Sequence, residues 1–375
     1  MASRRRKLIP RVDRGPLRVM FLITSMPVGG AETLLVNLIR RLDRERFLPS
    51  LCCLKSLGPL GEILQHEIPA FSELTTGKRD LRVLPRLVRL LRRERIDAVI
   101  TVGAGDKMFW GRIAARIAGV PVVGCAIHST GWPDAIGRLN RSRLLVRWTD
   151  AFIGVASAHG KHLVEVERFP REKVHIIPNG VDTERFRPSK AGESLRRELG
   201  IAANAPVVGI VAALRPEKDH ALFLQTAATV RGQLPGAQFM IVGDGDLRGE
   251  LEQQATQLGI RDAVHFLGNR SDVPEVLNAL DLFVLTSKME ANPVSILEAM
   301  ASGKPVVAPR VGSIAESVAE GETGYLTTAG DSNAAAARWI ELLSDPVRSR
   351  QFGAAGRKVV VDHWSLERMV EGYEQ

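Results

Sequence analysis

Three features are scarce in this chain of 375 residues: cysteine, aromatic side chains and long uncharged apolar runs. The cysteines, Cys52, Cys53 and Cys125, have a spacing that suits neither a disulfide framework nor a zinc site. Aromatic residues make up 5% of the chain, which leaves little for stacking nucleic-acid bases, and no nucleic-acid-binding motif is present. No apolar run reaches the ~18 residues that indicate a membrane-spanning helix. We therefore expect no nucleic-acid partner, no disulfide and no membrane span.

The N-terminal residues argue against secretion. The basic group Arg4–Lys7 is not followed by the apolar stretch and small-residue cleavage site of a signal peptide, because Leu17–Ile23 indicates a first strand. Residues 1–16 are basic and aperiodic, and they predict a disordered tail. We expect a cytoplasmic protein whose cysteines are buried and reduced.

Charge is divided unevenly along the chain. Residues 1–185 hold 32 Lys and Arg against 18 Asp and Glu, whereas the remainder holds 19 against 24. This split favours an anionic partner for the first half, either a membrane surface or a phosphate-bearing acceptor. Within that half, Lys78–Arg95 has an apolar stripe opposite an arginine face: Leu84, Leu87, Val88 and Leu91 against Arg82, Arg86, Arg89 and Arg93. A crossover helix packed on a sheet is the favoured interpretation, and its arginine face can still meet anionic lipid at the inner face of a membrane.

Short apolar runs alternate with helical patterns twice along the chain, which is typical of an α/β fold with parallel sheets. The turn residues Pro178–Asp182 separate the two series. We therefore predict two Rossmann-like units, over residues 17–185 and 186–360, that face each other across a cleft, and a closing helix over 361–375. The runs that predict strands are Leu17–Thr24, Ala98–Val102, Val122–Ala126 and Ala151–Val155, then Val207–Ala212, Gln238–Val242, Val264–Leu267, Leu282–Leu285 and Pro305–Ala308.

A helix start follows the predicted strand Leu282–Leu285. Asn292 is expected as the N-cap and Pro293 as the first helical residue, with Val294 next and Gly303 ending the helix at positive φ. Free N–H groups and a partial positive charge at such a helix start favour an anion such as a phosphate.

Two glutamates flank this helix start. Glu290 lies in the preceding loop, and Glu298 is expected in the second turn of the helix. Their carboxylates can accept hydrogen bonds from sugar hydroxyls while the helix start binds a phosphate.

Basic residues follow the first strand of the second unit. If the strand extends that far, side-chain alternation places Arg215 on the same side as Ala213. The guanidinium fork of Arg215 suits a phosphate, and Lys218 follows three residues later. The alternative for both is a solvated turn residue.

The turn after Gln238–Val242 contains an Asp-x-Asp pair. Asp244 and Asp246 could be taken for a metal clamp, but such pairs are common in turns and no further oxygen ligands accompany them. We expect a turn and no metal, with Gly243 allowing close approach of backbone to a ligand.

The segment with Glu290 and Glu298 resembles the family-4 retaining glycosyltransferases, whose hallmark is two glutamates separated by seven residues and followed by Ala-Met-Ala-x-Gly-Lys-Pro-Val-Val. The resemblance spans nearly the whole chain and implies a GT-B fold, in which the final helix braces the first domain. It implies that Glu290 lies against the donor sugar, that Glu298 binds the ribose, and that Lys218 grips the diphosphate with an arginine. Ala213 occupies that arginine's usual position, so Arg215 is the candidate substitute.

The resemblance also implies roles for several turns. Gly29 and Gly30 follow the first strand and would lie under the sugar and diphosphate. His128 would lie near the donor sugar, although a lone histidine is more often structural. The remaining residues expected at the donor are Gly243, Asn292, Pro293, Val294, Gly312, Ser313 and Glu316.

Together these features predict a retaining, metal-independent glycosyltransferase without a cofactor. The expected donor is a nucleoside-diphosphate sugar, most simply a UDP-sugar, and the expected acceptor is a glycan or lipid-linked molecule of polysaccharide or glycolipid synthesis. Two alternatives stay open: a sugar-nucleotide epimerase of the same fold, and an inactive homologue that only binds nucleotide-sugar.

Overall fold

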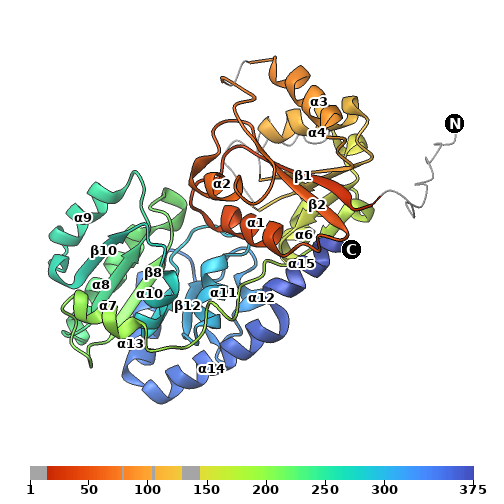
Figure 1. Cartoon of the computed structure of the whole chain (residues 1–375). Coiled ribbons are helices and arrows are strands. Elements are labelled where there is room, and N and C mark those ends of the chain that lie inside the picture. The colour runs from red at the N-terminus through yellow and green to blue at the C-terminus, as the bar shows by residue number, and fades with distance from the viewer. Residues whose placement is uncertain (1–14, 78–79, 104–105, 129–143) are drawn as a thin grey trace.

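The computed structural model describes residues 15–77, 80–103, 106–128 and 144–375. Within these residues the chain forms two units, each built on a parallel sheet flanked by helices (Figure 1). The predicted α/β fold class is confirmed. Of the tail predicted over residues 1–16, only Gly15 and Pro16 are described, and Arg4–Lys7 and Lys78 also lie outside the described residues.

The first unit has, among the described residues, a seven-stranded sheet in the order β3-β2-β1-β4-β5-β6-β7. Its central strand is buried from Val19 to Ile23, as expected of a parallel strand covered on both faces. Its elements are β1 (Leu17–Ile23), α1 (Gly30–Arg41), β2 (Phe47–Cys53), α2 (Gly58–Leu64), β3 (Ala70–Phe71), α3 (Val83–Arg93), β4 (Ala98–Val102), α4 (Asp106–Ala118), β5 (Val122–Ala126), η1 (Val146–Trp148), β6 (Ala151–Gly154), α6 (Ser157–Glu165), η2 (Arg171–Lys173) and β7 (Val174–Ile176).

The second unit has a six-stranded sheet in the order β10-β9-β8-β11-β12-β13. Its core is one continuous apolar cluster that includes Phe223, Phe239 and Trp339. Its elements are α7 (Gly192–Glu198), β8 (Val207–Val211), η3 (Pro216–Lys218), α8 (His220–Gln233), β9 (Gln238–Val242), α9 (Arg248–Gln257), η4 (Arg261–Ala263), β10 (Val264–Gly268), α10 (Val273–Ala279), β11 (Leu282–Val284), α11 (Val294–Ala301), β12 (Val306–Pro309), α12 (Ile314–Ser317), β13 (Gly324–Thr327), α13 (Ser332–Ser344) and α14 (Pro346–His363), and α15 (Leu366–Glu374) follows.

Both sheets reverse their strand order beside the first strand of the unit. β1 pairs with β2 on one side and β4 on the other, and β8 pairs with β9 and β11. Such a reversal opens a crevice at the carboxyl ends of the strands, where ligands of open α/β sheets bind. The glycine turn after β1 and the polar loops after β8 and β11 lie at these two positions.

Helix α3 is turned differently from the prediction. It buries Val83, Leu87, Leu90 and Leu91, while Leu84 and Val88 of the predicted stripe are only partly buried. The reason is that α3 packs against α4 as well as against the sheet, so the centre of its buried face is shifted around the helix from the predicted apolar stripe. The four-arginine face is correspondingly incomplete: Arg86 pairs with Asp80 at 2.9 Å and donates to the Leu74 carbonyl, and Arg93 pairs with Glu94 at 2.8 Å.

The end of the chain crosses between the units. Phe352 and Val360 of α14 belong to the core of the second unit, whereas Leu366 and Met369 of α15 belong to a core of the first. At the crossing, Val181 N donates to the Trp364 carbonyl at 2.9 Å, so that this segment runs beside the earlier link between the units. Figure 1 shows α15 lying along the first unit close to α1.

Candidate active site

Loops from both sheets meet at the carboxyl ends of their strands. Gly30, after β1, packs on the side chain of Val294 at the start of α11, since a Cβ on Gly30 would lie 3.7 Å from Val294 Cγ2. The side chain of Asn179, in the link between the units, donates to the Asn292 carbonyl at 2.9 Å. Gly29–Gly30 and the start of α11 are therefore parts of one site.

A buried ion pair joins two of the predicted site residues. Lys218 Nζ lies 2.6 Å from Glu290 Oε1, and the same oxygen accepts a hydrogen bond from Ser287 Oγ at 2.7 Å. The carboxylate of Glu290 is 8% exposed, so the pair is largely withdrawn from water. Because both partners are held, Lys218 presents its charge from a fixed position.

The backbones around this pair are also tied together. Lys288 N donates to the Glu217 carbonyl at 2.8 Å, and Thr286 Oγ1 donates to the Lys218 carbonyl at 3.0 Å. The loops after β8 and β11 thus form one rigid platform. Sequence reasoning missed the contributions of Thr286, Ser287 and Asn179, because hydroxyl and amide residues in loops carry no signal until their long-range partners are known.

The loop after β12 lies directly on Glu290. Gly312 has φ +54°, and a Cβ there would overlap the Glu290 carbonyl. Only glycine allows this approach, because any Cβ would overlap that carbonyl, and the left-handed conformation also favours glycine. The neighbouring Ser313 is buried, and its Oγ has no hydrogen-bond partner among the described residues.

The start of α11 differs from the prediction. The helix begins at Val294 and Pro293 is the N-cap, with ψ 117°, because Pro293 keeps an extended backbone. Asn292 is therefore not the N-cap: its side chain is buried, and neither polar atom has a partner among the described residues. Pro293 offers no side-chain cap to this helix start, and among the described residues its first N–H groups stay available to an anion. Gly303 ends the helix with φ +71°, as predicted.

Glu298 lies in α11 and is partly buried. Burial raises the pKa of Glu298 to about 7, although the positive charge of Arg185 opposes the shift. The carboxyl is thus half protonated near neutrality in the free protein. A group in this state can change its charge when a ligand binds.

Arg215 lies across from the first unit. Strand β8 ends at Val211 and Arg215 lies in the following turn, so the strand alternation that would have placed Arg215 beside Ala213 does not extend that far. Its side chain is exposed, with no hydrogen bond or salt bridge to a described residue. Burial raises the pKa of Glu32 in α1, and the charge of Arg215 lowers it, so the two groups interact electrostatically across the units.

The turn after β9 is built from glycine and aspartate. Gly243 has φ +132°, and a Cβ there would overlap the Ala212 carbonyl, so glycine is required here for a close approach within the protein's own backbone. Its approach to a ligand stays a prediction. Asp244 accepts a hydrogen bond from Gly245 N at 2.8 Å and lies 3.6 Å from Arg248. In the part of the chain that the structure describes, no three His, Cys, Asp or Glu side chains gather as metal ligands.

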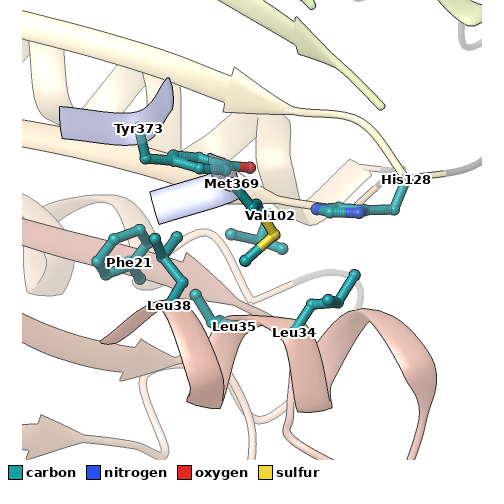
Figure 2. Close-up of a pocket in the computed structure, with 8 residues that line it drawn as sticks. All are labelled: Phe21, Leu34, Leu35, Leu38, Val102, His128, Met369 and Tyr373. Atoms are coloured by element: carbon teal, nitrogen blue, oxygen red, sulfur yellow. The ribbon is translucent and has the colours of Figure 1, made fainter. Parts of the chain in front are cut away.

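His128 points into a small apolar cavity between α1, the sheet and α15 (Figure 2). The cavity has a volume of about 10 Å³, room for no more than a water molecule. Burial lowers the pKa of His128 to about 4, so the ring is neutral at pH 7, and its Nδ1 has no partner among the described residues. The structure gives His128 a packing position beside Met369, and its contact with a donor sugar stays a prediction.

Glu316 links the two units. Its carboxylate accepts hydrogen bonds from Ser157 N at 2.8 Å and Ala158 N at 2.6 Å, which are the first N–H groups of α6. Glu316 thus makes a capping contact with the first unit, and its predicted contact with a donor stays a prediction.

Two protein families match the chain. The family described as Glycosyltransferase Family 4 matches residues 28–185, and the family Glycosyl transferases group 1 matches residues 192–359. A UDP-Gal:alpha-D-GlcNAc-diphosphoundecaprenol alpha-1,3-galactosyltransferase of Escherichia coli is 31% identical over 77% of this chain and 78% of its own length. An N-acetyl-alpha-D-glucosaminyl L-malate synthase of Bacillus anthracis is 32% identical over 82% of both chains.

Solved structures show the same architecture. HepE of Anabaena, crystallised with UDP and glucose and also with UDP-glucose, superimposes with a TM-score of 0.83 at 26% identity, over 95% of this chain and 97% of that one. WaaG, a glycosyltransferase of lipopolysaccharide biosynthesis, superimposes with a TM-score of 0.76 at 16% identity, and it supports the fold alone. The predicted GT-B fold is confirmed, and the chain belongs to the group-1, family-4 glycosyltransferases.

Proposed function

We propose that this enzyme transfers a hexose from a UDP-sugar to a glycan or lipid-linked acceptor, with retention at the anomeric carbon and without a metal. The observation that carries the proposal is the Lys218–Glu290 pair at the uncapped start of α11, opposite Gly29–Gly30. The UDP and UDP-glucose bound to HepE, and the UDP-galactose donor in the name of the E. coli relative, support a uridine donor.

The proposed mechanism depends on stabilising the departing diphosphate. As the bond between the anomeric carbon and the phosphate oxygen breaks, negative charge grows on the diphosphate. Lys218, Arg215 and the first N–H groups of α11 are the positive groups at this site, so they balance that charge without a metal. The acceptor hydroxyl attacks the same face of the sugar that the diphosphate leaves, and its proton passes to the departing phosphate oxygen.

The carboxylates have the other tasks. Glu290 orients the transferred sugar through its hydroxyls, with Ser287 and Lys218 fixing the carboxylate. Glu298 accepts hydrogen bonds from the ribose hydroxyls. No covalent bond between sugar and enzyme forms in this scheme. Neutral His128 contributes no charge.

A panel of nucleotide-sugars tests the proposal. A donor is expected to raise the melting temperature by mass action, and nucleotide is expected to be released when an acceptor is added. Lys218→Met should bind the donor weakly and lose turnover, whereas Lys288→Met, on the same loop platform but 62% exposed, should keep both. Sugar isomerisation without an acceptor would instead establish an epimerase, and tight binding without turnover an inactive homologue.

We further propose that the first unit works at an anionic membrane surface. Arg82, the N-cap residue of α3, and Arg89 within the helix are exposed and form no side-chain hydrogen bond or salt bridge with the described residues. Each basic side chain near such a surface contributes about 1 kcal/mol, and salt weakens the attraction because the screening length is about 8 Å at physiological ionic strength. The lipid-diphosphate acceptor in the name of the E. coli relative supports this placement.

Vesicle co-sedimentation tests the membrane proposal. None of the described helices has the length and apolar character to cross a bilayer. Binding to anionic vesicles at low salt should exceed binding to neutral ones and should fall in the Arg82→Ala/Arg89→Ala variant. Arg197→Ala, which also removes an exposed arginine but in the second unit, is the control. Equal binding to both kinds of vesicle would refute the proposal and favour a soluble acceptor.

A further inference from the structure

A polar hollow of about 430 Å³, largely open to solvent and called the cavity below, lies in the first unit after the carboxyl ends of β2 and β3, at the edge of the sheet where Gly29–Gly30 follows β1. The polar side chains that line it follow the carboxyl ends of β2 and β3 or belong to α2 and the turn after it: Ser56, Glu62, Gln65, His66, Ser72 and Glu73.

Backbone hydrogen bonds tie this cavity to the candidate active site. Lys55 N donates to the Thr24 carbonyl and Met26 N donates to the Leu57 carbonyl, both at 2.9 Å. Gly58, with φ +70°, fits tightly under Met26, since a Cβ there would lie 2.8 Å from the Met26 carbonyl. The cavity wall and the connection that leads to Gly29 are therefore one folded piece. In Figure 1, α2 lies beside α1 on the side of the first unit that is turned towards the second.

The polar side chains that line the cavity are free to bind a ligand. None of the six polar side chains makes a hydrogen bond or ion pair with a described residue, and all but Ser72 are exposed. They offer two carboxylates, an amide, an imidazole and two hydroxyls, a set that can both accept and donate hydrogen bonds. No Lys or Arg lines the cavity.

The charge of the cavity selects among ligands. Glu62 and Glu73 bring two negative charges with no cation in the lining, so a phosphate or carboxylate group would be repelled. Sugar hydroxyls suit the same groups well, because hydrogen bonds from a neutral donor to a carboxylate are stronger than those between neutral partners.

We propose that this cavity binds a sugar residue of the acceptor that carries no acidic group. The inference rests on the proposed function, and it names where the acceptor glycan lies: along the sheet edge, next to the sugar that is transferred. The phosphate of a lipid-linked acceptor would then lie outside this cavity, towards the basic surfaces of the first unit.

Saturation-transfer NMR on the full chain tests this proposal without knowledge of the natural acceptor. The probes are the methyl glycosides of glucose, galactose, mannose, N-acetylglucosamine and glucosamine, added to protein loaded with UDP. At least one should bind to the unaltered protein. Glu62→Gln/Glu73→Gln should weaken that binding by at least about tenfold, equivalent to ~1.4 kcal/mol, while Glu45→Gln, an exposed change before β2, should leave it unchanged. All three changed residues are exposed, so folding is not at risk.

The outcomes separate this inference from the proposed function. UDP-glucose binding is measured in the same samples and should be equal in all variants. If UDP-glucose binds but no glycoside does, or if the double variant binds glycosides like the unaltered protein, the cavity proposal is overturned and the proposed function stands. If glycosides bind as expected but no UDP-sugar does, the proposed donor is wrong while the glycan site remains.

Discussion

The two glutamates of α11 and its preceding loop should respond differently to substitution. Burial raises the pKa of Glu298 to about 7, so only half of the free protein carries an ionised carboxylate at neutral pH. Ribose hydroxyls bind the ionised form more strongly, so donor binding favours loss of the proton and affinity should rise with pH. If only the ionised form binds, the apparent Kd is larger than its limit by about 11-fold at pH 6 and about 1.1-fold at pH 8, a tenfold range equivalent to ~1.4 kcal/mol.

Calorimetric titration with UDP-glucose between pH 6 and 8 measures this range. UDP-glucose is suitable because its diphosphate is a diester that keeps its charge over these values. Glu298→Gln should bind weakly with no slope, whereas Glu290→Gln should keep the slope and mainly lose turnover. Burial lowers the pKa of Lys304 to about 8, and any contribution from it would appear equally in both variants. A flat profile for the unaltered protein, or a slope that survives in Glu298→Gln, would refute the reasoning.

Three further predictions concern the loops and the metal. Gly312→Ala should cost about 1–3 kcal/mol of unfolding free energy and most of the activity, because its Cβ would displace the backbone of Glu290. Gly321→Ala, at φ +77° with open space around its Cβ, should lose stability but keep activity. Equal activity in the two variants would contradict this prediction. Glu316→Ala should cost about 1 kcal/mol of unfolding free energy, because two N–H groups of α6 lose their acceptor. The radius of gyration in small-angle scattering should increase, since Glu316 links the two units, and an unchanged radius would contradict this role. Full activity should survive EDTA, because Asp244 is engaged in its own turn, and activity that returns only with added magnesium or manganese would overturn that expectation.

Much of the fold could be predicted because buried parallel strands leave a continuous apolar run. The runs Ala98–Val102, Val122–Ala126 and Gln238–Val242 have the same bounds as β4, β5 and β9. Elements β2, α2 and β3 were not predicted. Pro49 interrupts the apolar pattern that would have predicted β2, because proline is rare inside strands. It is tolerated on the side of β2 that faces β3, since β3 pairs only with Leu51 and Cys52 and needs no N–H from Pro49.

The candidate site was predictable in its parts and not in its connections. Glu290 and Lys218 stand out as charged residues at strand ends, yet their ion pair joins residues 72 positions apart. The same applies to the packing of Gly312 on Glu290, which no local pattern reveals. The buried face of α3 was predicted incorrectly for a related reason. The amphipathic pattern alone does not show which of two neighbouring apolar rows on the helix packs against α4.

The crossings between the units explain how the halves of the site stay opposed. Gly180 lies so close to the second crossing that a Cβ would sit 2.6 Å from the Ser365 carbonyl, and Leu366 N donates to the Val181 carbonyl at 3.0 Å. The two chain segments that connect the units therefore act as one hinge, because neither can shift without breaking the hydrogen bonds between them. The contacts of Gly30 with Val294 and of Glu316 with α6 then limit the rotation of one unit relative to the other about this hinge. Arg215 is exposed and makes no hydrogen bond or salt bridge with a described residue, so its guanidinium donors are free for a ligand. Its role as the substitute for the arginine absent at Ala213 stays a prediction.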